Sequence, residues 1–394
     1  MNEKHIDLSS VTVLDASTLL AGPLSMGMLA DLGANVIKVE APTGDPLRGY
    51  PPFRNGVSLI HKVTNRGKRA ITCDLRKAEG QELFRKLAQN VDVVAVNFRP
   101  QTLKKWGIDF DTLSKINPRL VFLHISAFGR TGPYHERPGF ARIAEGFAGL
   151  AGITGFADRE PVLNGYPIVD AMTGVYGAYA VASALYSRAV TGKGALIDLA
   201  LYEPLLRTME DLVVGLPSDG RSRMGNANPY VVPNNLYLCA DGEYIIIAAS
   251  TDNIFSRLTQ ALGHPELASD PRFVTNEQRV INRIPLDALI AAFAGTRSSG
   301  DLLATLREHE VAAGPVHLPG DIPGDPHIRE RGNLVMVHDE ESGEDLRMQA
   351  PIPLGAGTIR FPGRALGEDN ESVYKEILGL SPEDVRTLVA SGAI

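Results

Sequence analysis

Residues 11–40 read VTVLDASTLLAGPLSMGMLADLGANVIKVE, and this stretch decides the fold. The apolar run Val11–Leu14, rich in β-branched residues, is typical of a short buried strand. A helix over Leu24–Leu32 follows, and Gly33 supplies the left-handed residue that often ends a helix. Val36–Val39 is the next apolar run. Strand, helix and strand in this order predict a βαβ unit with two parallel strands.

The same alternation continues through the N-terminal half of the chain. Strands that alternate with helices are typical of a parallel sheet covered on both faces. Ligands bind such sheets beyond the carboxyl ends of the strands. The further expected strands are Ala70–Leu75, Val91–Val96, Leu120–Ile125 and Ala195–Ala200, and the expected helices are Ala78–Leu87, Leu113–Ile116 and a small-residue helix from Ala171.

A second domain is expected from about Gly225, because 394 residues exceed what one compact core usually holds. Leu236–Ala240 and Tyr244–Ala248 flank an Asp-Gly pair, which favours a hairpin turn. Helical patterns follow at Ile254–Leu262, Leu286–Phe293 and Leu302–His309, and a last helix is expected over Pro382–Ser391.

Composition argues against several classes of protein. A net charge of −7 argues against nucleic-acid binding. The two cysteines, Cys73 and Cys239, form neither a disulfide framework nor a metal-binding spacing, and we expect Cys73 to be buried. The longest uncharged run, Ala171–Ser187, is too short to span a bilayer, and the N-terminus lacks an apolar signal core. We therefore expect a cytoplasmic protein that binds no metal, nucleic acid or membrane.

A local basic strip stands out on this acidic chain. Seven Lys and Arg residues lie between Arg54 and Lys77, against one acid. Such a strip suits a small polyanion, and it suits a solvated face equally well. Its members are Arg54, Lys62, Arg66, Lys68, Arg69, Arg76 and Lys77.

The opening βαβ unit also raises the question of a dinucleotide site. Glu40 ends the second strand, where dinucleotide-binding folds carry an acid for the ribose. The GxGxxG fingerprint is missing, however, because the loop reads AGPLSMG over residues 21–27. Pro23 also lacks the backbone N–H group from which a pyrophosphate oxygen would accept a hydrogen bond. The sequence favours a Rossmann-like scaffold used for another ligand.

Asp170 lies where a proline-containing loop meets the small-residue helix. Asp is a preferred helix N-cap, so the local sequence alone favours a structural role. The same place suits a nucleophile, because the helix dipole keeps a carboxylate ionised and an ionised carboxylate can attack an activated acyl group. Gly174 and Gly177 behind it allow another backbone or a thin cofactor arm to approach closely. Both roles remain open on local sequence.

Taken together, these segments resemble the CaiB/BaiF family, which holds the class III coenzyme A (CoA) transferases and the α-methylacyl-CoA racemases. The resemblance covers nearly the whole chain and rests on many short motifs in the family's order. The most specific is DAMTG over residues 170–174. The others include LAGP (20–23), LADLGANVIKVE (29–40), GDP (44–46), NRGKR (65–69), NFRP (97–100), GRTGP (129–133), RPGF (137–140) and TGKG (191–194).

The resemblance implies a mechanism in which Asp170 attacks a thioester, forming an aspartyl–acyl anhydride and then an aspartyl-CoA thioester. CoA and acyl-CoA are then substrates, and neither a permanently bound cofactor nor a metal is implied. Met224, Gly225 and Asn226 fall at the family's substrate loop. The implied CoA-binding residues are Leu20, Ala21, Cys73, Arg76, Asn97, Phe98, Lys105 and Arg137.

The chain departs from the family pattern at several positions. Ala41 stands where an Arg often meets the adenine end of CoA, Ala141 where many transferases have Asp, and Glu145 where Gln is common. The glycine-rich loop of the formyl-CoA:oxalate transferases is absent, so oxalate is not the favoured acceptor. Family habits favour succinyl-CoA as donor and a small dicarboxylate-like acceptor such as itaconate, mesaconate, citramalate or a sulfur analogue. Arg142 and Arg223 are candidates for a distal carboxylate, and an exposed salt bridge explains either as well.

Two alternatives stand beside the transferase. Racemases of the family keep the aspartate and add a histidine, and Phe140 occupies that position here. A racemase needs this second acid or base, which Phe140 cannot supply. A non-catalytic CoA-binding protein of the same fold would bind CoA without turnover.

The resemblance also implies an architecture and an assembly. It implies a large Rossmann-like α/β domain over residues 1–200, a linker over 201–224 and a smaller α/β domain over 225–320. A linker and C-terminal segment over 321–394 would return to the large domain. Dimers of the family interlock like links of a chain, which implies a homodimer.

Overall fold

The computed structural model describes residues 6–209, 214 and 223–394 of the chain. The chain forms two compact units. The first contains Met1–Leu150, Asn164–Leu216 and Pro326–Ile394, and the second contains Ala151–Leu163 and Pro217–Asp325. Residues 151–163 of the second unit fall within the range expected for the large domain. The expected linker over 201–224 lies largely outside the described residues.

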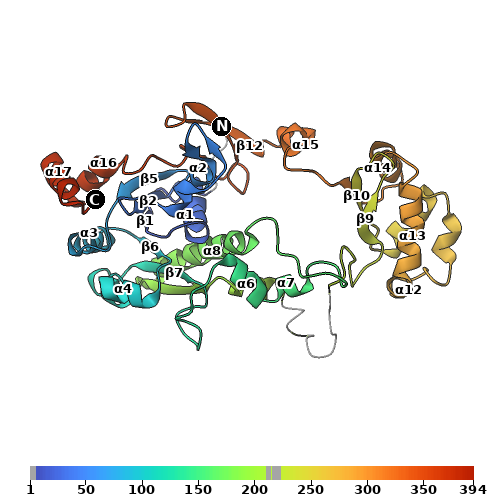
Figure 1. Cartoon of the computed structure of the whole chain (residues 1–394), viewed down its shortest axis with the longest axis horizontal. Coiled ribbons are helices and arrows are strands. Elements are labelled where there is room, and N and C mark those ends of the chain that lie inside the picture. Colours follow the sequence, from blue (N-terminus) through green and yellow to red (C-terminus); the bar gives the residue numbers. More distant parts are fainter. Residues whose placement is uncertain (1–5, 210–213, 215–222) are drawn as a thin grey trace. The chain divides into compact units, whose positions relative to one another are not determined.

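A six-stranded parallel sheet forms the centre of the first unit (Figure 1). The strand order is β5-β2-β1-β6-β7-β8. The chain adds strands on one side of β1 up to β5 and then on the other side from β6 onward, so the order reverses between β1 and β6 although all strands are parallel. This is the switch point at which such sheets bind ligands. The predicted α/β class with a Rossmann-like parallel sheet is confirmed. The strands are β1 (Thr12–Asp15), β2 (Asn35–Glu40), β5 (Lys68–Thr72), β6 (Val93–Val96), β7 (Val121–Ser126) and β8 (Ala195–Ala200).

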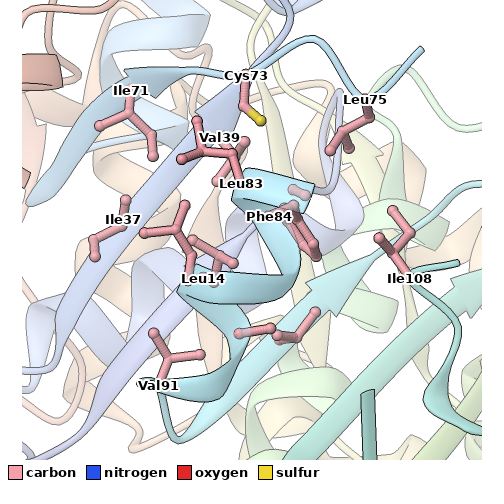
Figure 2. Close-up of a cluster of buried hydrophobic side chains, with 14 of the residues drawn as sticks. Leu14, Ile37, Val39, Ile71, Cys73, Leu75, Leu83, Phe84, Val91 and Ile108 are labelled. Atoms are coloured by element: carbon pink, nitrogen blue, oxygen red, sulfur yellow. The ribbon is translucent and has the colours of Figure 1, made fainter. Parts of the chain in front are cut away.

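Both faces of the sheet are buried, because alternate strand residues point to opposite sides. Leu14 and Ile37 belong to a core with Phe84 of α3, and Figure 2 shows these side chains on the α3 side of the sheet. Val13 and Val36 belong to the core on the other face, with helices α1 and α8. The core that contains Leu14 includes residues of α3 (Ala78–Gln89), α4 (Pro100–Trp106), α5 (Phe110–Ile116), α16 (Asn370–Leu378) and α17 (Pro382–Ser391). The core that contains Val13 includes residues of α1 (Ala21–Asp31) and α8 (Ile168–Thr191).

Helices α1 and α8 approach each other unusually closely. A Cβ atom added to Gly174 would lie 2.8 Å from Leu24 Cδ2, and one added to Gly177 would lie 2.4 Å from Ser25 Oγ. These distances are shorter than real Cβ contacts, so neither position accepts a side chain without a shift. Gly174 and Gly177, which were expected to allow the close approach of another segment, therefore allow the close approach of α1.

Helix α8 has 24 residues and is, by length and composition alone, long and apolar enough to cross a membrane. It extends beyond the uncharged run at both ends, to Ile168 and Thr191. Length therefore does not exclude a membrane span, contrary to the expectation from that run. One face of the helix, with Val169 and Val181, is buried in the core of the sheet unit.

The C-terminal segment of the chain packs on the first unit. Val373 and Tyr374 of α16 are fully buried in the same core as α3, and the Tyr374 hydroxyl donates to the carbonyl of Thr72 at 2.7 Å. The remaining elements of this unit are β3 (Phe53–Arg54), β4 (Val57–Ser58), α2 (Leu59–Thr64), α6 (Ala141–Phe147), α9 (Glu203–Thr208), α15 (Pro326–Glu330), β12 (Leu334–Asp339) and β13 (Glu344–Gln349), while α7 (Leu150–Ile153) leads into the second unit.

The second unit contains a three-stranded antiparallel sheet in the order β11-β10-β9. The predicted hairpin is confirmed: β9 pairs with β10, and Gly242 in the turn has a φ of 84°. Its elements are β9 (Asn234–Leu238), β10 (Tyr244–Ala248), α11 (Asp252–Ala261), α12 (Asn276–Ile281), α13 (Arg283–Ala294), α14 (Ser299–Glu308) and β11 (Ala313–Pro315).

Candidate active site

The loop after β1 is fastened to the loop after β6, across the switch point of the sheet. The amide of Thr18 donates to Asn97 Oδ1 at 2.9 Å, and Asn97 Nδ2 donates to the carbonyl of Thr18 at 2.8 Å. The next residue, Leu19, has a φ of 66°, a left-handed conformation that costs such a side chain about 1–3 kcal/mol. Asp45 Oδ1 accepts a bond from the Leu19 amide at 3.2 Å. The surroundings thus hold a strained loop in one place.

A network of four buried ions, Asp15, Lys38, Asp45 and Lys68, lies beneath this loop and is called the buried ion network below. Lys68 Nζ lies 2.8 Å from Asp15 Oδ2, and Lys38 Nζ lies 2.8 Å from Asp45 Oδ2. Lys38 also donates to the carbonyl of Ser17 in the loop. Burial alone would raise the pKa of Asp15, but Lys68 and Lys38 outweigh burial and hold that pKa below its usual value.

A cavity of about 520 Å³ opens beside the loop, at the carboxyl ends of the strands. Its lining is mostly apolar. Four of the implied catalytic and CoA-binding residues meet there: Leu20, Ala21, Asn97 and Asp170. Arg142, the candidate for a distal carboxylate, lines the same space. We call this space the Asp170 cavity.

A second cavity of about 240 Å³ is its neighbour, since Thr18 lines both. Cys73, Arg76 and Phe98 line this space, together with Ala41. Cys73 is buried as expected, and burial raises the pKa of its thiol to about 12, which makes it a poor nucleophile. Arg76 holds Asp74 with two bonds, from Nε at 2.8 Å and from Nη2 at 3.0 Å.

Asp170 is the third residue of α8 rather than its N-cap, which is Pro167. The expectation of a capping role is therefore wrong, because the helix begins two residues before Asp170 and no side chain caps it. Among the described residues, no group hydrogen-bonds or pairs with the Asp170 carboxylate. Burial raises its pKa to about 6. A half-buried carboxylate with unused lone pairs, lining a cavity, is equipped to act as a nucleophile or a base.

Glu40 is not available for a ribose. Its carboxylate accepts two bonds from Arg48, at 2.8 and 2.7 Å, and one from the amide of Asp45 at 2.8 Å. The structure therefore agrees with the missing glycine fingerprint, and the acid at the end of β2 serves the fold.

The basic strip is divided between the interior and the surface of the protein, so neither a polyanion site nor a solvated face describes its two buried members. Lys62 and Lys68 are fully buried and pair with Asp339 and Asp15. The strip runs through β5 and α2, whose side chains point into the core as well as outward. Ion pairs also engage Arg54 with Glu344, Arg66 with Asp31 and Arg69 with Glu376, while Arg76 lines the smaller cavity.

The remaining CoA-binding candidates and the loop candidates lie outside both cavities. Lys105 is exposed on α4, and the guanidinium of Arg137 lies 3.7 Å from the ring centre of Tyr134. Neither lines the Asp170 cavity or its neighbour. The loop candidates Met224, Gly225 and Asn226 belong to the second unit, where the Gly225 amide donates to the carbonyl of Gly155 at 2.8 Å.

Sequence reasoning missed several lining residues of the Asp170 cavity. Ser126 ends β7, Ala127 directly follows it, and Leu201 directly follows β8, so the rule about strand ends would have found them. Tyr50 and Ile60 come from the long excursion between β2 and β5. No local signal marks those two.

The chain is similar to known proteins over nearly its whole length. It matches the model of "CoA-transferase family III" over residues 8–370. It is 40% identical to the succinyl-CoA–D-citramalate CoA-transferase of Chloroflexus aurantiacus, with 98% of each chain covered. It is 35% identical to the succinate–glutarate CoA-transferase of Agrobacterium fabrum, with 96% of this chain and 97% of that one covered. The crystal structure of a CaiB/BaiF family protein from Brucella suis aligns with a TM-score of 0.83 at 36% identity, covering 95% of this chain and 100% of that one.

Proposed function

The chain belongs to CoA-transferase family III, the CaiB/BaiF family, and from this premise we propose that it transfers CoA through covalent intermediates on Asp170. The supporting observation is the Asp170 carboxylate itself. It lines a largely apolar cavity at the switch point of a parallel sheet, and no group among the described residues neutralises or hydrogen-bonds it.

Each step exchanges one acyl bond for another. The Asp170 carboxylate attacks the thioester carbonyl and the C–S bond breaks. This step forms an aspartyl–acyl anhydride and releases CoA thiolate. The thiolate then attacks the aspartyl carbonyl of the anhydride, which gives an aspartyl-CoA thioester and releases the first acid. An acceptor carboxylate repeats the two steps in reverse order. Two carboxylates exchange one thioester, and no net proton or electron is consumed.

The surroundings of Asp170 favour this chemistry. A carboxylate whose pKa is raised by burial is less stabilised as an anion and is the better nucleophile for it. Ala21, Ile125 and Leu201 are among the apolar residues that line the same cavity. An apolar lining limits water and so protects an anhydride, which water would hydrolyse.

For the substrates, we propose succinyl-CoA as donor and a small dicarboxylic acid as acceptor. Support comes from the relatives. Proteins 34–40% identical to this chain are named for transfer from succinyl-CoA to D-citramalate or L-malate. A further relative, 36% identical, is named for succinyl-CoA and mesaconate.

The geometry favours a transferase over a racemase. Phe140 precedes α6 and lines the Asp170 cavity, where a racemase would need a second acid or base. No histidine is among the described residues that line this cavity. The buried His124 lies on β7 with its Nε2 at 2.7 Å from the carbonyl of Phe98. A non-catalytic CoA-binding protein is the remaining alternative, and turnover separates it from the transferase.

We also propose that the protein is a homodimer. Helix α8 leaves a line of apolar side chains exposed on the face opposite the core, formed by Val175, Tyr179, Tyr186 and Val190. Exposed apolar faces of this length are usually covered by a partner. Sedimentation or light scattering of the purified protein would show twice the chain mass if a dimer forms.

The test of the nucleophile is Asp170→Ala. We expect CoA exchange to fall by about 10⁴-fold or more, as for the loss of a covalent nucleophile. Hydroxylamine added during turnover should convert Asp170 of the parent protein to a hydroxamate, which peptide mass spectrometry detects. Asp109→Ala is the matched control, because Asp109 caps α5 and lines neither cavity. An Asp170→Ala protein with full exchange activity would rule the mechanism out.

A further inference from the structure

We propose that Arg142 selects substrates with a second carboxylate by binding the distal carboxylate of a dicarboxylic acyl group. This inference rests on the proposed transferase function and names the specificity residue of the same site. Arg142 lies in the first turn of α6 and lines the Asp170 cavity.

The first argument is the charge of the cavity. Among the described residues that line it, Asp170 and Arg142 are the charged ones, and most of the others are apolar. A succinyl group would place a second anion in this space beside the Asp170 carboxylate. Two like charges repel strongly where little water screens them, and an unpaired buried carboxylate is costly. A dicarboxylic acyl group therefore needs a cation, and Arg142 is the one that this lining offers.

The second argument is the way the guanidinium is held. Nη1 of Arg142 donates to the carbonyl of Asn164 at 2.6 Å and lies 3.6 Å from Glu145 Oε2. In the described part of the chain, its Nε and Nη2 have no hydrogen-bond partner. Its side chain is 49% exposed and lines the Asp170 cavity, so a ligand in that cavity can reach the side chain. Nε and Nη2 form the edge that binds a carboxylate with two parallel bonds.

Glu145 acts as the anchor for this arrangement. Its side chain is buried, and Oε1 accepts bonds from the amide and the Nδ2 of Asn164, at 2.8 and 2.9 Å. Glu145 and Asn164 thus fix each other and hold one edge of the Arg142 guanidinium. The opposite edge is left in place for a ligand, which lowers the ordering cost of binding.

The other arginine candidates are already engaged. Arg223 donates from Nε to the carbonyl of Phe156 at 3.1 Å and from Nη2 to that of Arg159 at 2.7 Å. These bonds use the edge that a carboxylate would need. Arg137 stacks on Tyr134 and does not line the Asp170 cavity.

The experiment compares two acyl-CoA esters that differ at the distal group, succinyl-CoA and its amide analogue succinamoyl-CoA. Labelled succinate exchanges into succinyl-CoA, and labelled succinamate into succinamoyl-CoA, so the natural acceptor need not be known. We expect the parent protein to prefer the succinyl pair in kcat/KM by about 10- to 100-fold, as for a charge-assisted pair of bonds. Arg142→Met should abolish that preference while leaving succinamoyl exchange within about threefold. Arg142→Lys keeps the positive charge but cannot form the two parallel bonds of a guanidinium, so its preference for the succinyl pair should lie between those of the parent and Arg142→Met.

The controls separate this inference from structural damage and from the transferase proposal. Arg119→Met removes an equivalent charge at the opposite end of β7, where Arg119 bonds the carbonyl of Gly192, and should keep the preference. Equal loss of both exchanges in Arg142→Met and Arg142→Lys would overturn the inference by making Arg142 structural. Loss of the preference in Arg223→Met, with Arg142→Met unaffected, would overturn it in favour of Arg223. Undiminished exchange in Asp170→Ala would instead defeat the transferase mechanism, whatever Arg142 does.

Discussion

The buried ion network and the Asp170 cavity treat a carboxylate in opposite ways, although both lie at the switch point of the same sheet. Asp15 ends β1, is fully buried, and receives bonds from Lys68 and from Ser17. Asp170 is half-buried, and no described residue bonds its carboxylate. The two lysines lower the pKa of Asp15, whereas burial raises the pKa of Asp170 to about 6.

The difference teaches how this fold separates stability from chemistry. A buried carboxylate with every partner in place holds the strained loop after β1 and is not available for reaction. A carboxylate left without partners destabilises the fold and is free to bond a substrate. The same residue type therefore serves as support in one region and as reagent in the other.

The largest expected effect on stability comes from breaking the supported carboxylate. Asp15→Asn leaves Lys68 without its buried counterion, and we expect it to lower the free energy of unfolding by about 3–5 kcal/mol. Urea denaturation measures this. The control is Glu82→Ala, which removes an exposed pair with Arg85 and should cost no more than about 0.5 kcal/mol. Equal effects of the two substitutions would contradict the structural role given to Asp15.

A smaller effect of opposite sign is expected at the unsupported carboxylate. The folded-state pKa of Asp170, about 6, lies above the ordinary value of 3.8, so the folded protein binds the proton of Asp170 more tightly than the unfolded chain does. The ionised carboxylate therefore costs stability, and this cost develops between pH 3.8 and about 6 and is fully present above pH 6. Asp170→Asn should raise the free energy of unfolding by about 1–3 kcal/mol at pH 8 and by nothing below pH 3.8. A loss of stability at pH 8 would show that Asp170 has partners after all.

The smallest of these effects is on the rate. If the ionised Asp170 is the nucleophile, kcat/KM for CoA exchange should fall on the acid side with an apparent pKa of about 6. The rate at pH 5 would then be about tenfold below the plateau. Initial rates from pH 4.5 to 8, with a check that the protein is folded throughout, measure this. A rate that stays level down to pH 4.5 would exclude a raised pKa.

The sheet could be predicted from the sequence because its strands are continuous apolar runs between turn signals. Each strand expected before residue 201 forms, and the largest shift is at Leu75, where β5 already ends at Thr72. Helix starts were less predictable. Helix α1 begins at Ala21 rather than at Leu24, because Pro23 in a first turn needs no partner for an N–H. The sequence pattern around Pro23 is typical of a loop, and the predicted helix therefore begins three residues too late.

The site was predictable only in part, for reasons of distance along the chain. Asp170 was found by the family motif, while its local sequence alone favoured a cap. Lys68 was expected in a basic strip, but its partner Asp15 lies 53 residues away, and no local pattern reports such a pair. The same limit applies to one contact of Arg142: Glu145 lies on the same helix, but Asn164, whose carbonyl accepts from Arg142, lies 22 residues away.

The close approach of α1 and α8 sets the position of Asp170, and it is possible only because Gly174 and Gly177 have no side chain. Gly174 is one turn beyond Asp170, and a methyl group at Gly174 or Gly177 would meet the side chain of Leu24 or Ser25, so that either this side chain or the helix that carries Asp170 would have to shift. Misplacement of a reacting group by about 1 Å can slow a reaction about 100-fold. A substitution that adds one carbon where α8 packs against α1, without changing Asp170 itself, would therefore slow the reaction.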